Sequence, residues 1–343
     1  MKRYGVLVVD DSAFMRKAIS EIIESDSELF VVGIARNGED ALEKIKRLKP
    51  CLVTMDLDMP VIDGLSALEL IMAETPLPVV MLSQFTNEST TATIKSLELG
   101  AVDFILKDDL FVEGNSGMKD QFLEVIKASI QAAFHKEQRV KVEEVEEKET
   151  DKEIIVESDL IIIGCSTGGP SALQEILPKF PADFPVPVFV VQHMPPGFTK
   201  PLADRFNEMC NLNVKEASHG EVMEKGTIYI ATAGYQTTII EHGDGRKTFN
   251  VGPYSGEYLY KPSVDVTLQS AAPIFKEKLI TAILTGMGTD GVEGTRYVKM
   301  NNGTVFVEAE ETCVVYGMPK AVYEAGLADK KVSLPNMYHY LTK

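Results

Sequence analysis

The stretch YGVLVVDDSAFMRKAISEII, residues 4–23, determines the expected architecture of the first half of the chain. Its apolar run has the length of a buried strand, and it ends in two aspartates. After Ser12, apolar residues recur at positions 14, 15, 18, 19, 22 and 23, which is the spacing of one helix face. A strand followed at once by an amphipathic helix is the repeating unit of an α/β fold, so we expect a parallel sheet here.

Four further strand–helix pairs follow in the same half. The expected strands are FVVGIA, CLVTMD, PVVMLS and AVDFIL, and the expected helices are EDALEKIKRL, LSALELIMAE, TTATIKSLEL and one within 119–135. This alternation predicts a doubly wound parallel sheet. Ligand sites in such sheets lie beyond the carboxyl ends of the strands, so polar residues at those ends are candidates for function.

The bulk properties of the chain limit the classes of function. A length of 343 residues gives room for two domains, and a net charge of −17 repels a nucleic-acid backbone. No apolar run approaches the ~20 residues of a membrane helix, and no signal-peptide pattern is present. The four cysteines lack metal-ligand spacing. We therefore expect a cytoplasmic protein with reduced thiols that neither inserts into a membrane nor binds nucleic acid.

A charged segment divides the chain. Residues 136–153, KEQRVKVEEVEEKETDKE, contain 13 charged residues in 18 and almost nothing to bury. Apolar burial does not offset the ordering entropy of such a segment. We therefore expect a first domain at 1–135, a charged linker at 136–157 and a second domain at 158–343.

Side chains that bind metals and phosphoryl groups gather at the expected strand ends of the first domain. Asp10 and Asp11 end the first strand and Asp56 ends the third, while Ser83 and Lys107 end the fourth and fifth. Carboxylate oxygens suit Mg²⁺, and Asp56 has the chemistry of a nucleophile toward a phosphoryl group. Asp11 alone is typical of a helix cap. The whole set at four strand ends favours a site.

The motifs VVDDS, MDLDMPVIDG and GAVDFILK resemble those of the receiver domains of two-component response regulators, over about residues 1–130. The resemblance implies a flavodoxin-like fold. It also implies roles for the strand-end residues: the phosphoacceptor Asp56, the Mg²⁺ ligands Asp10, Asp11 and Asp56, and the supporting residues Ser83 and Lys107. Phe104 stands at the position of the family's switch aromatic. Asp108 replaces the proline that usually follows the lysine, which predicts a looser turn.

The second domain opens with a serine in a glycine-rich turn. DLIIIG runs into CSTGGPSALQEILPKF, a strand–turn–helix pattern, and GCSTG matches the G-x-S-x-G spacing that raises a nucleophilic serine, here Ser166, above a strand end. The same string is typical of an anion site in which backbone N–H groups face a phosphate, or of a plain structural turn. The local sequence leaves these alternatives open.

Two other strand ends supply partners for a serine nucleophile. Of the five histidines, His193 alone ends a strong strand, PVFVVQ, and an imidazole is the usual base for a hydroxyl. LITAILTGMGTDG, residues 279–291, is a further strand with a glycine-rich turn, in which Asp290 has the chemistry to orient that imidazole. Taken alone, His193 fits a structural role and Asp290 an ordinary capped turn. The three strand ends together favour a catalytic triad.

The sequence argues against two familiar kinds of site. An α/β-hydrolase presents Ser, then Asp, then His, whereas the order here is Ser166, His193, Asp290. GCSTGG lacks the G-x-G-x-x-G fingerprint, which disfavours a dinucleotide site.

The motifs IIIGCSTGGPSAL, VVQHMPPGFT, KPSVDVTLQSAA and ILTGMGTDG are similar, in sequence and order, to those of the response-regulator-gated protein-glutamate methylesterases of bacterial chemotaxis, the CheB family. The resemblance implies a Rossmann-like parallel-sheet α/β/α catalytic domain with a small β-hairpin. It also implies five site residues: the nucleophile Ser166, the base His193, its orienting partner Asp290, the auxiliary Thr167 and the oxyanion-hole N–H of Met287. Residues 231–236, ATAGYQ, depart from the family's usual proline-glycine turn followed by histidine.

The resemblance predicts hydrolysis of glutamyl γ-methyl esters on chemotaxis receptors, gated by phosphorylation of Asp56, and some relatives also deamidate receptor glutamines. It implies Mg²⁺ for phosphorylation and no cofactor for the esterase reaction. The implied partners are methylated chemoreceptors as substrates and a chemotaxis histidine kinase as phosphodonor. One alternative is a non-enzymatic response regulator whose second domain binds an anionic ligand or a partner protein. Another is a standalone hydrolase of small esters.

Overall fold

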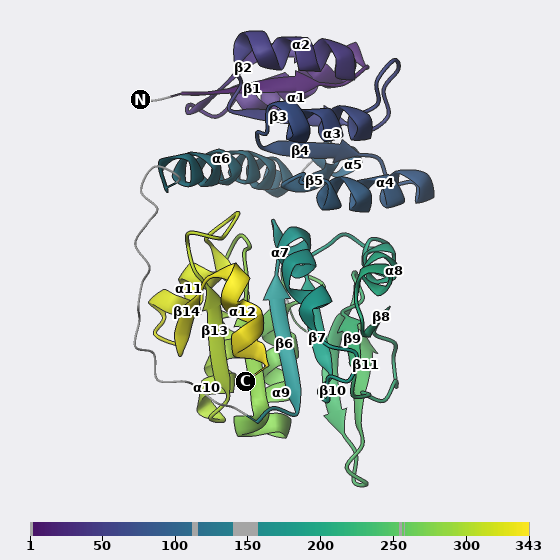
Figure 1. Cartoon of the computed structure of the whole chain (residues 1–343), viewed down its shortest axis with the longest axis vertical. Coiled ribbons are helices and arrows are strands. Elements are labelled where there is room, and N and C mark those ends of the chain that lie inside the picture. Colours follow the sequence, from purple (N-terminus) through teal and green to yellow (C-terminus); the bar gives the residue numbers. More distant parts are fainter. Residues whose placement is uncertain (1–2, 112–115, 140–156, 254–255, 257, 343) are drawn as a thin grey trace. The chain divides into compact units, whose positions relative to one another are not determined.

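The computed structural model describes residues 3–111, 116–139, 157–253, 256 and 258–342. The chain separates into two units, Met1–Glu143 and Glu144–Lys343 (Figure 1). The linker expected at 136–157 lies mostly outside the described residues, and its first four positions belong to the last turn of a helix that ends at Arg139. Within the described ranges, no helix is both long and apolar enough to cross a membrane.

The first unit is a five-stranded parallel sheet with the order β2-β1-β3-β4-β5. The strands are β1 (Tyr4–Val9), β2 (Leu29–Ala35), β3 (Leu52–Asp56), β4 (Val79–Ser83) and β5 (Asp103–Leu106). The helices are α1 (Ala13–Glu24), α2 (Gly38–Leu48), α3 (Gly64–Glu74), α4 (Asn87–Glu98), the one-turn α5 (Lys107–Leu110) and α6 (Ser116–Arg139). β3 and β4 are buried along their whole length, as strands covered by helices on both faces must be. The doubly wound fold expected from the sequence is confirmed.

The start of α1 decides between two interpretations of Asp11. The helix is capped by Ser12, whose Oγ accepts a hydrogen bond from the Met15 N–H at 3.4 Å. The helix-cap interpretation of Asp11 is therefore wrong, because the following residue occupies the capping position. The strand order reverses between β1 and β3, and their carboxyl ends flank the crevice in which such folds bind ligands.

The second unit contains a seven-stranded parallel sheet, β14-β13-β12-β6-β7-β9-β8, and a separate antiparallel hairpin, β10-β11. The strands are β6 (Leu160–Cys165), β7 (Val188–Gln192), β8 (Asn213–Glu216), β9 (Thr227–Ile230), β10 (Gln236–Glu241), β11 (Lys247–Gly252), β12 (Leu279–Ile283), β13 (Thr304–Glu308) and β14 (Lys330–Val332). The helices are α7 (Gly169–Ile176), η1 (Leu177–Lys179), α8 (Thr199–Met209), α9 (Val264–Phe275), η2 (Lys276–Lys278), α10 (Val292–Met300), α11 (Met318–Glu324) and α12 (Leu334–Leu341). Both the sheet and the hairpin agree with the expected fold class.

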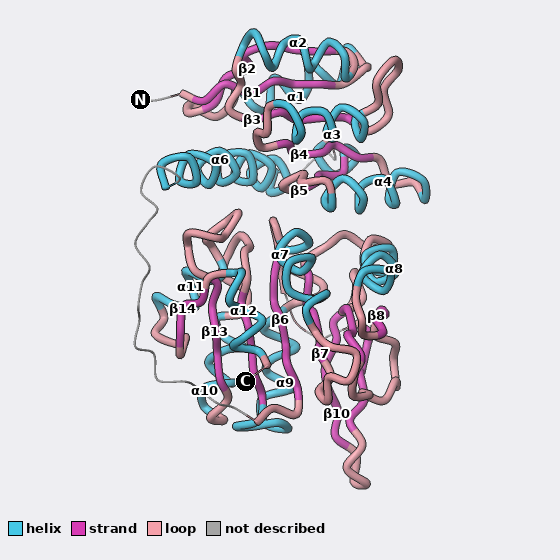
Figure 2. The backbone as a smooth tube through the Cα atoms, viewed as in Figure 1, coloured by secondary structure: helices cyan, strands magenta, loops and turns pink. Residues whose placement is uncertain are grey.

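Helices cover the sheet of the second unit (Figure 2), where α7 packs against α12 and α9 packs against α10. The hairpin lies on α9, and its Phe249 joins the core with Phe189 and Tyr229, at ring-centroid distances of 4.8 and 4.7 Å. β6 lies between β12 and β7, where the strand order reverses. The carboxyl ends of these three strands therefore form the crevice expected to hold the site.

Candidate active site

The sheet register brings Ser166 and His193 together. Cys165, the last residue of β6, pairs with Gln192, the last residue of β7, and the His193 N–H donates to the Cys165 carbonyl at 3.0 Å. On the other side of β6, the Ser166 N–H donates to the Thr285 carbonyl just beyond β12, also at 3.0 Å. Three segments that are distant in sequence thus meet at one edge of the sheet.

His193 and Asp290 form a buried pair. His193 Nε2 lies 2.7 Å from Asp290 Oδ2, and both side chains are only 6% exposed. Because Asp290 occupies Nε2, the ring nitrogen left to face a serine is Nδ1. That atom is buried and has no hydrogen-bond partner among the described residues, so the structure does not join it to Ser166. Catalytic hydrogen bonds of this kind commonly form only when substrate is bound.

Asp290 accepts hydrogen bonds from four donors. Oδ2 accepts from the Val264 N–H at 2.7 Å as well as from His193, and Oδ1 accepts from Ser263 Oγ at 2.9 Å and the Asp265 N–H at 3.0 Å. Burial alone would raise the pKa of Asp290, but the hydrogen bond and charge of His193 and the backbone donors outweigh it, and the pKa lies below its ordinary value. The carboxylate is therefore ionised and able to stabilise an imidazolium.

Tyr260 holds the open face of the imidazole. Its ring stacks on His193 with centroids 4.0 Å apart and planes inclined by 7°. Stacking of this kind restricts the rotation of the His193 ring. No sequence pattern predicts this contact, because Tyr260 lies 67 positions from His193 in a loop without periodicity.

Gln192 connects the nucleophile and the base through their backbones. Its buried side-chain amide donates from Nε2 to the Ser166 carbonyl at 3.0 Å and to the His193 carbonyl at 2.9 Å. Its Oε1 accepts from Cys165 Sγ at 3.0 Å. Gln192 was read from the sequence only as the end of a strand, although a polar residue that ends an otherwise apolar strand is a usable signal for such a role.

The turn after β12 lies directly against Ser166. A Cβ at Gly286 would be 2.9 Å from Ser166 Cβ and 2.5 Å from Met318 Sδ, so only glycine permits this approach. The Gly286 carbonyl accepts from the Gly317 and Met318 N–H groups at 3.1 and 2.8 Å. These bonds fix the peptide that leads to the partly exposed Met287, whose N–H is the expected oxyanion donor.

Thr285 holds this turn in place through hydrogen bonds to three neighbouring segments. Its Oγ1 donates to the carbonyl of the buried Thr167 at 2.9 Å and accepts from the Val315 N–H at 2.9 Å. Its N–H donates to Oε2 of Glu308, the last residue of β13, at 2.8 Å. Thr167 is therefore held to the turn through its backbone carbonyl. Glu308 is a buried carboxyl that the sequence analysis did not single out.

Glu308 gives the second unit a pH-dependent stability. Burial raises the pKa of Glu308 from 4.5 to about 7. A raised folded-state pKa contributes stability that is complete below the unfolded-state pKa and is lost as the pH rises through about 7. We expect Glu308→Gln to remove this dependence. Between pH 4.5 and 8 the unsubstituted chain should lose up to about 3 kcal/mol of unfolding free energy that the variant keeps. Denaturant unfolding across that range measures the difference, and parallel curves would contradict the assignment.

The segment 231–236, which departs from the family pattern, is hydrogen-bonded through Gln236 to the loop that contains Tyr260. Gln236 is buried, and its Nε2 donates to the Tyr260 carbonyl at 2.7 Å while its Oε1 accepts from the Ser263 N–H at 2.8 Å. Gln236 thus binds the backbone on both sides of Lys261 and Pro262, next to the ring that stacks on His193.

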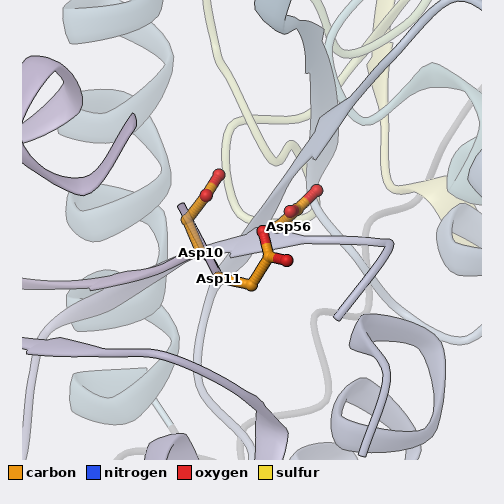
Figure 3. A group of neighbouring side chains, drawn as sticks. All are labelled: Asp10, Asp11 and Asp56. Atoms are coloured by element: carbon orange, nitrogen blue, oxygen red, sulfur yellow. The ribbon is translucent and has the colours of Figure 1, made fainter. Parts of the chain in front are cut away.

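The first unit holds an acidic cluster at the ends of β1 and β3. Figure 3 shows Asp10, Asp11 and Asp56 side by side, and one oxygen from each lies within 4.8 Å of the others. Lys107 Nζ lies 2.8 Å from Asp10 and 2.7 Å from Asp56. Three carboxylates with Asp11 exposed to solvent form the hard-oxygen donor set that Mg²⁺ prefers, so the residues present fit that ion.

Charges in this cluster are strongly coupled. Burial raises the pKa of Asp56 to about 6, against the opposing effect of Lys107. Burial alone would lower the pKa of Lys107, but its hydrogen bonds to Asp10 and Asp56 outweigh it and keep the pKa above its ordinary value. Ser83 is buried beside the cluster, where its Oγ lies 2.8 Å from Thr93 Oγ1.

The remaining expected residues of the first unit also have definite positions. Phe104 is buried in β5, 6% exposed. Asp108 is exposed in the single helical turn of α5, whose first residue is the buried Lys107. The residue that replaces the usual proline thus lies inside a helical turn.

Comparison with known proteins follows the division into two units. Residues 161–341 match the family model of the CheB methylesterase, and residues 6–110 match that of the response regulator receiver domain. The protein-glutamate methylesterase/protein-glutamine glutaminase of Symbiobacterium thermophilum is 41% identical over 355 residues, covering 98% of this chain and 96% of the relative. The protein of the same name from Oceanobacillus iheyensis is 40% identical over 352 residues, covering 100% and 99%. The crystal structure of the Thermotoga maritima CheB methylesterase catalytic domain is 44% identical with a TM-score of 0.53, covering 55% of this chain and 98% of that one.

Proposed function

The chain belongs to the CheB family of protein-glutamate methylesterases with a receiver domain. We propose that its Ser166, His193 and Asp290 hydrolyse glutamyl γ-methyl esters on chemoreceptors. The observation that supports the proposal is the edge of the sheet at which the three residues meet. Ser166 and His193 follow the paired residues Cys165 and Gln192, and Asp290 lies 2.7 Å from the imidazole.

The proposed reaction has two halves. Ser166 Oγ attacks the ester carbonyl while His193 Nδ1 takes its proton, and the Met287 N–H stabilises the oxyanion. His193 then returns the proton to the leaving methoxide, and methanol departs from an acyl-enzyme. Water, activated by the same imidazole, hydrolyses the acyl-enzyme to glutamate and free Ser166. With a receptor glutamine the same steps release ammonia, which accounts for the double activity in the names of the relatives.

A serine-directed fluorophosphonate tests the nucleophile without a receptor. We expect it to label the chain covalently, and we expect labelling to be lost in both Ser166→Ala and His193→Ala, because attack needs the base as well as the hydroxyl. Labelling that persists in Ser166→Ala would contradict the assignment. No labelling, together with thermal stabilisation by phosphate ligands, would favour the non-enzymatic binding domain.

Regulation is assigned to the receiver domain, residues 1–135, joined through the charged segment 136–157 to the esterase domain, residues 158–343. Asp10, Asp11 and Asp56 would hold Mg²⁺, which supplies charge neutralisation during phosphoryl transfer when bound. Asp56 accepts the phosphoryl group from a chemotaxis histidine kinase. Lys107 pairs with the phosphoryl oxygens and the Ser83 hydroxyl donates a hydrogen bond to one of them. Phe104 is the switch aromatic that responds to phosphorylation. The phosphoryl group adds about −1.5 to −2 charges, and each tenfold of activation requires about 1.4 kcal/mol of differential stability.

Asp56→Asn tests this regulation. We expect the rate with a small phosphodonor and Mg²⁺ to fall to the rate without them, because the amide accepts no phosphoryl group. Methanol release from a methylated chemoreceptor is the measurement. Asp63→Asn is a matched control, since Asp63 caps α3 through the Ser66 N–H at 2.8 Å and asparagine caps as well. Stimulation that survives in Asp56→Asn would contradict the assignment of the phosphoacceptor.

A further inference from the structure

We propose that Asp265 is a positioning residue of the triad, which holds Asp290 in place through an exchange of helix caps between α9 and α10. The proposal rests on the proposed role of Asp290 as the partner of His193. Asp265 lies in the first turn of α9, and Asp290 lies directly before the cap of α10, Gly291. Each aspartate accepts hydrogen bonds from the beginning of the other helix.

The first half of the exchange is made by Asp290 at the start of α9. Its carboxylate accepts from the N–H groups of Val264 and Asp265, at 2.7 and 3.0 Å, and from the hydroxyl of the cap residue Ser263 at 2.9 Å. The first N–H groups of a helix have no partner within the helix, and the helix dipole favours a negative charge at this end. The start of α9 thus binds the same carboxylate that orients His193.

The second half is made by Asp265 at the start of α10. Its Oδ1 accepts from the Gly291 N–H at 2.9 Å and from the Gly294 N–H at 2.6 Å. The helices are close enough that a Cβ at Gly294 would lie 2.7 Å from Leu268 Cβ and 2.9 Å from Asp265 Cα. Since Gly291 follows Asp290 in the chain, this bond fixes the backbone that carries the triad carboxylate.

The exchange places the carboxylates of Asp265 and Asp290 close to each other. Burial, and then the charge of Asp290, raise the pKa of Asp265 to about 7, whereas the pKa of Asp290 is lowered. We expect Asp265 to act through the acceptor oxygen that it offers to the Gly291 and Gly294 N–H groups, so that a neutral side chain with the same oxygen serves as well. An asparagine at this position keeps such an oxygen, whereas an alanine does not.

Two variants of the full-length chain separate these contributions. We expect Asp265→Asn to keep kcat within about threefold of the unsubstituted enzyme. We expect Asp265→Ala to lower kcat by about 10²-fold with little change in KM, because a displacement of about 1 Å in a catalytic group has an effect of that size. The decisive readout is the low-field proton resonance of the His193–Asp290 hydrogen bond, which needs no substrate. It should persist in Asp265→Asn and disappear or shift upfield in Asp265→Ala.

Asp329→Ala is the matched control for lost stability. Asp329 also accepts a backbone N–H, that of Val305 at 2.7 Å, but at the amino end of β13, and it pairs with Lys299 in the last turn of α10 at 2.7 Å. Its loss should reduce the melting temperature and leave the resonance in place. If Asp265→Ala does not fold, Asp265→Asn alone tests the proposal. A folded Asp265→Asn variant that lacks the resonance, or whose kcat is more than tenfold lower, overturns the proposal. An Asp265→Ala variant that keeps both also overturns it, whereas absence of the resonance in the unsubstituted chain would instead contradict the triad.

Discussion

We expect Ser166→Ala to lower the rate of methyl-ester hydrolysis by a factor on the order of 10³–10⁶, the range observed when other triads lose their nucleophile. The fold should tolerate the change. Ser166 is held through its backbone, whose N–H donates to the Thr285 carbonyl and whose carbonyl accepts from the Gln192 amide. Steady-state methanol release and the melting temperature, measured on the same preparation, test both statements.

Ser218→Ala provides a comparison for Ser166→Ala. Ser218 is an exposed serine in the turn after β8, and its replacement should leave the rate unchanged within twofold. A Ser166→Ala variant that retains a rate within tenfold of the unsubstituted enzyme would show that another group attacks the ester.

The second large effect is expected for Asp290→Asn. Four donors converge on the carboxylate, from His193, Ser263, Val264 and the Asp265 backbone. An amide has a single acceptor oxygen, so its NH₂ group must face at least one of these donors. The imidazole then loses its orientation and its counter-charge, and kcat should fall by about 10⁴-fold, as when other triads lose this carboxylate.

Stability and activity should both change in Asp290→Asn, since a buried donor is left without an acceptor at a loss of about 1–3 kcal/mol. Asp329→Asn separates the two effects, because Asp329 contacts the Val305 N–H and the ammonium of Lys299, and neither partner belongs to the triad. A folded Asp290→Asn enzyme within tenfold of the unsubstituted kcat would remove Asp290 from the mechanism.

The sequence predicted the residues whose position follows from a strand end. Ser166 and His193 each come directly after an apolar run, and parallel strands bring their carboxyl ends to one edge, so the two could be assigned to the same crevice. The same argument applied to Asp10 and Asp56 in the first unit. The sequence did not decide which residue caps α1, because Asp11 and Ser12 are both good capping residues and only the backbone geometry distinguishes them.

The residues that hold the site in place could not be predicted in the same way. Tyr260 and Asp265 act through contacts with residues far along the chain, in or after a loop without periodicity, and no local pattern reports such a contact. Gln192 and Glu308 end apolar strands, but their partners depend on the register of β6 with β7 and on the path of the turn after β12. Their roles became visible only when the strands were paired.

The most direct test of the account is methanol release from a methylated chemoreceptor by the intact protein and by Ser166→Ala, each with and without a small phosphodonor and Mg²⁺. We expect release by the intact protein that increases with phosphodonor, and none above background in Ser166→Ala under either condition. Release that does not change with the phosphodonor would support the assignment of the triad and contradict the regulation by Asp56. Equal release by both proteins, or none by either, would contradict the assignment of Ser166 as the nucleophile of a methylesterase.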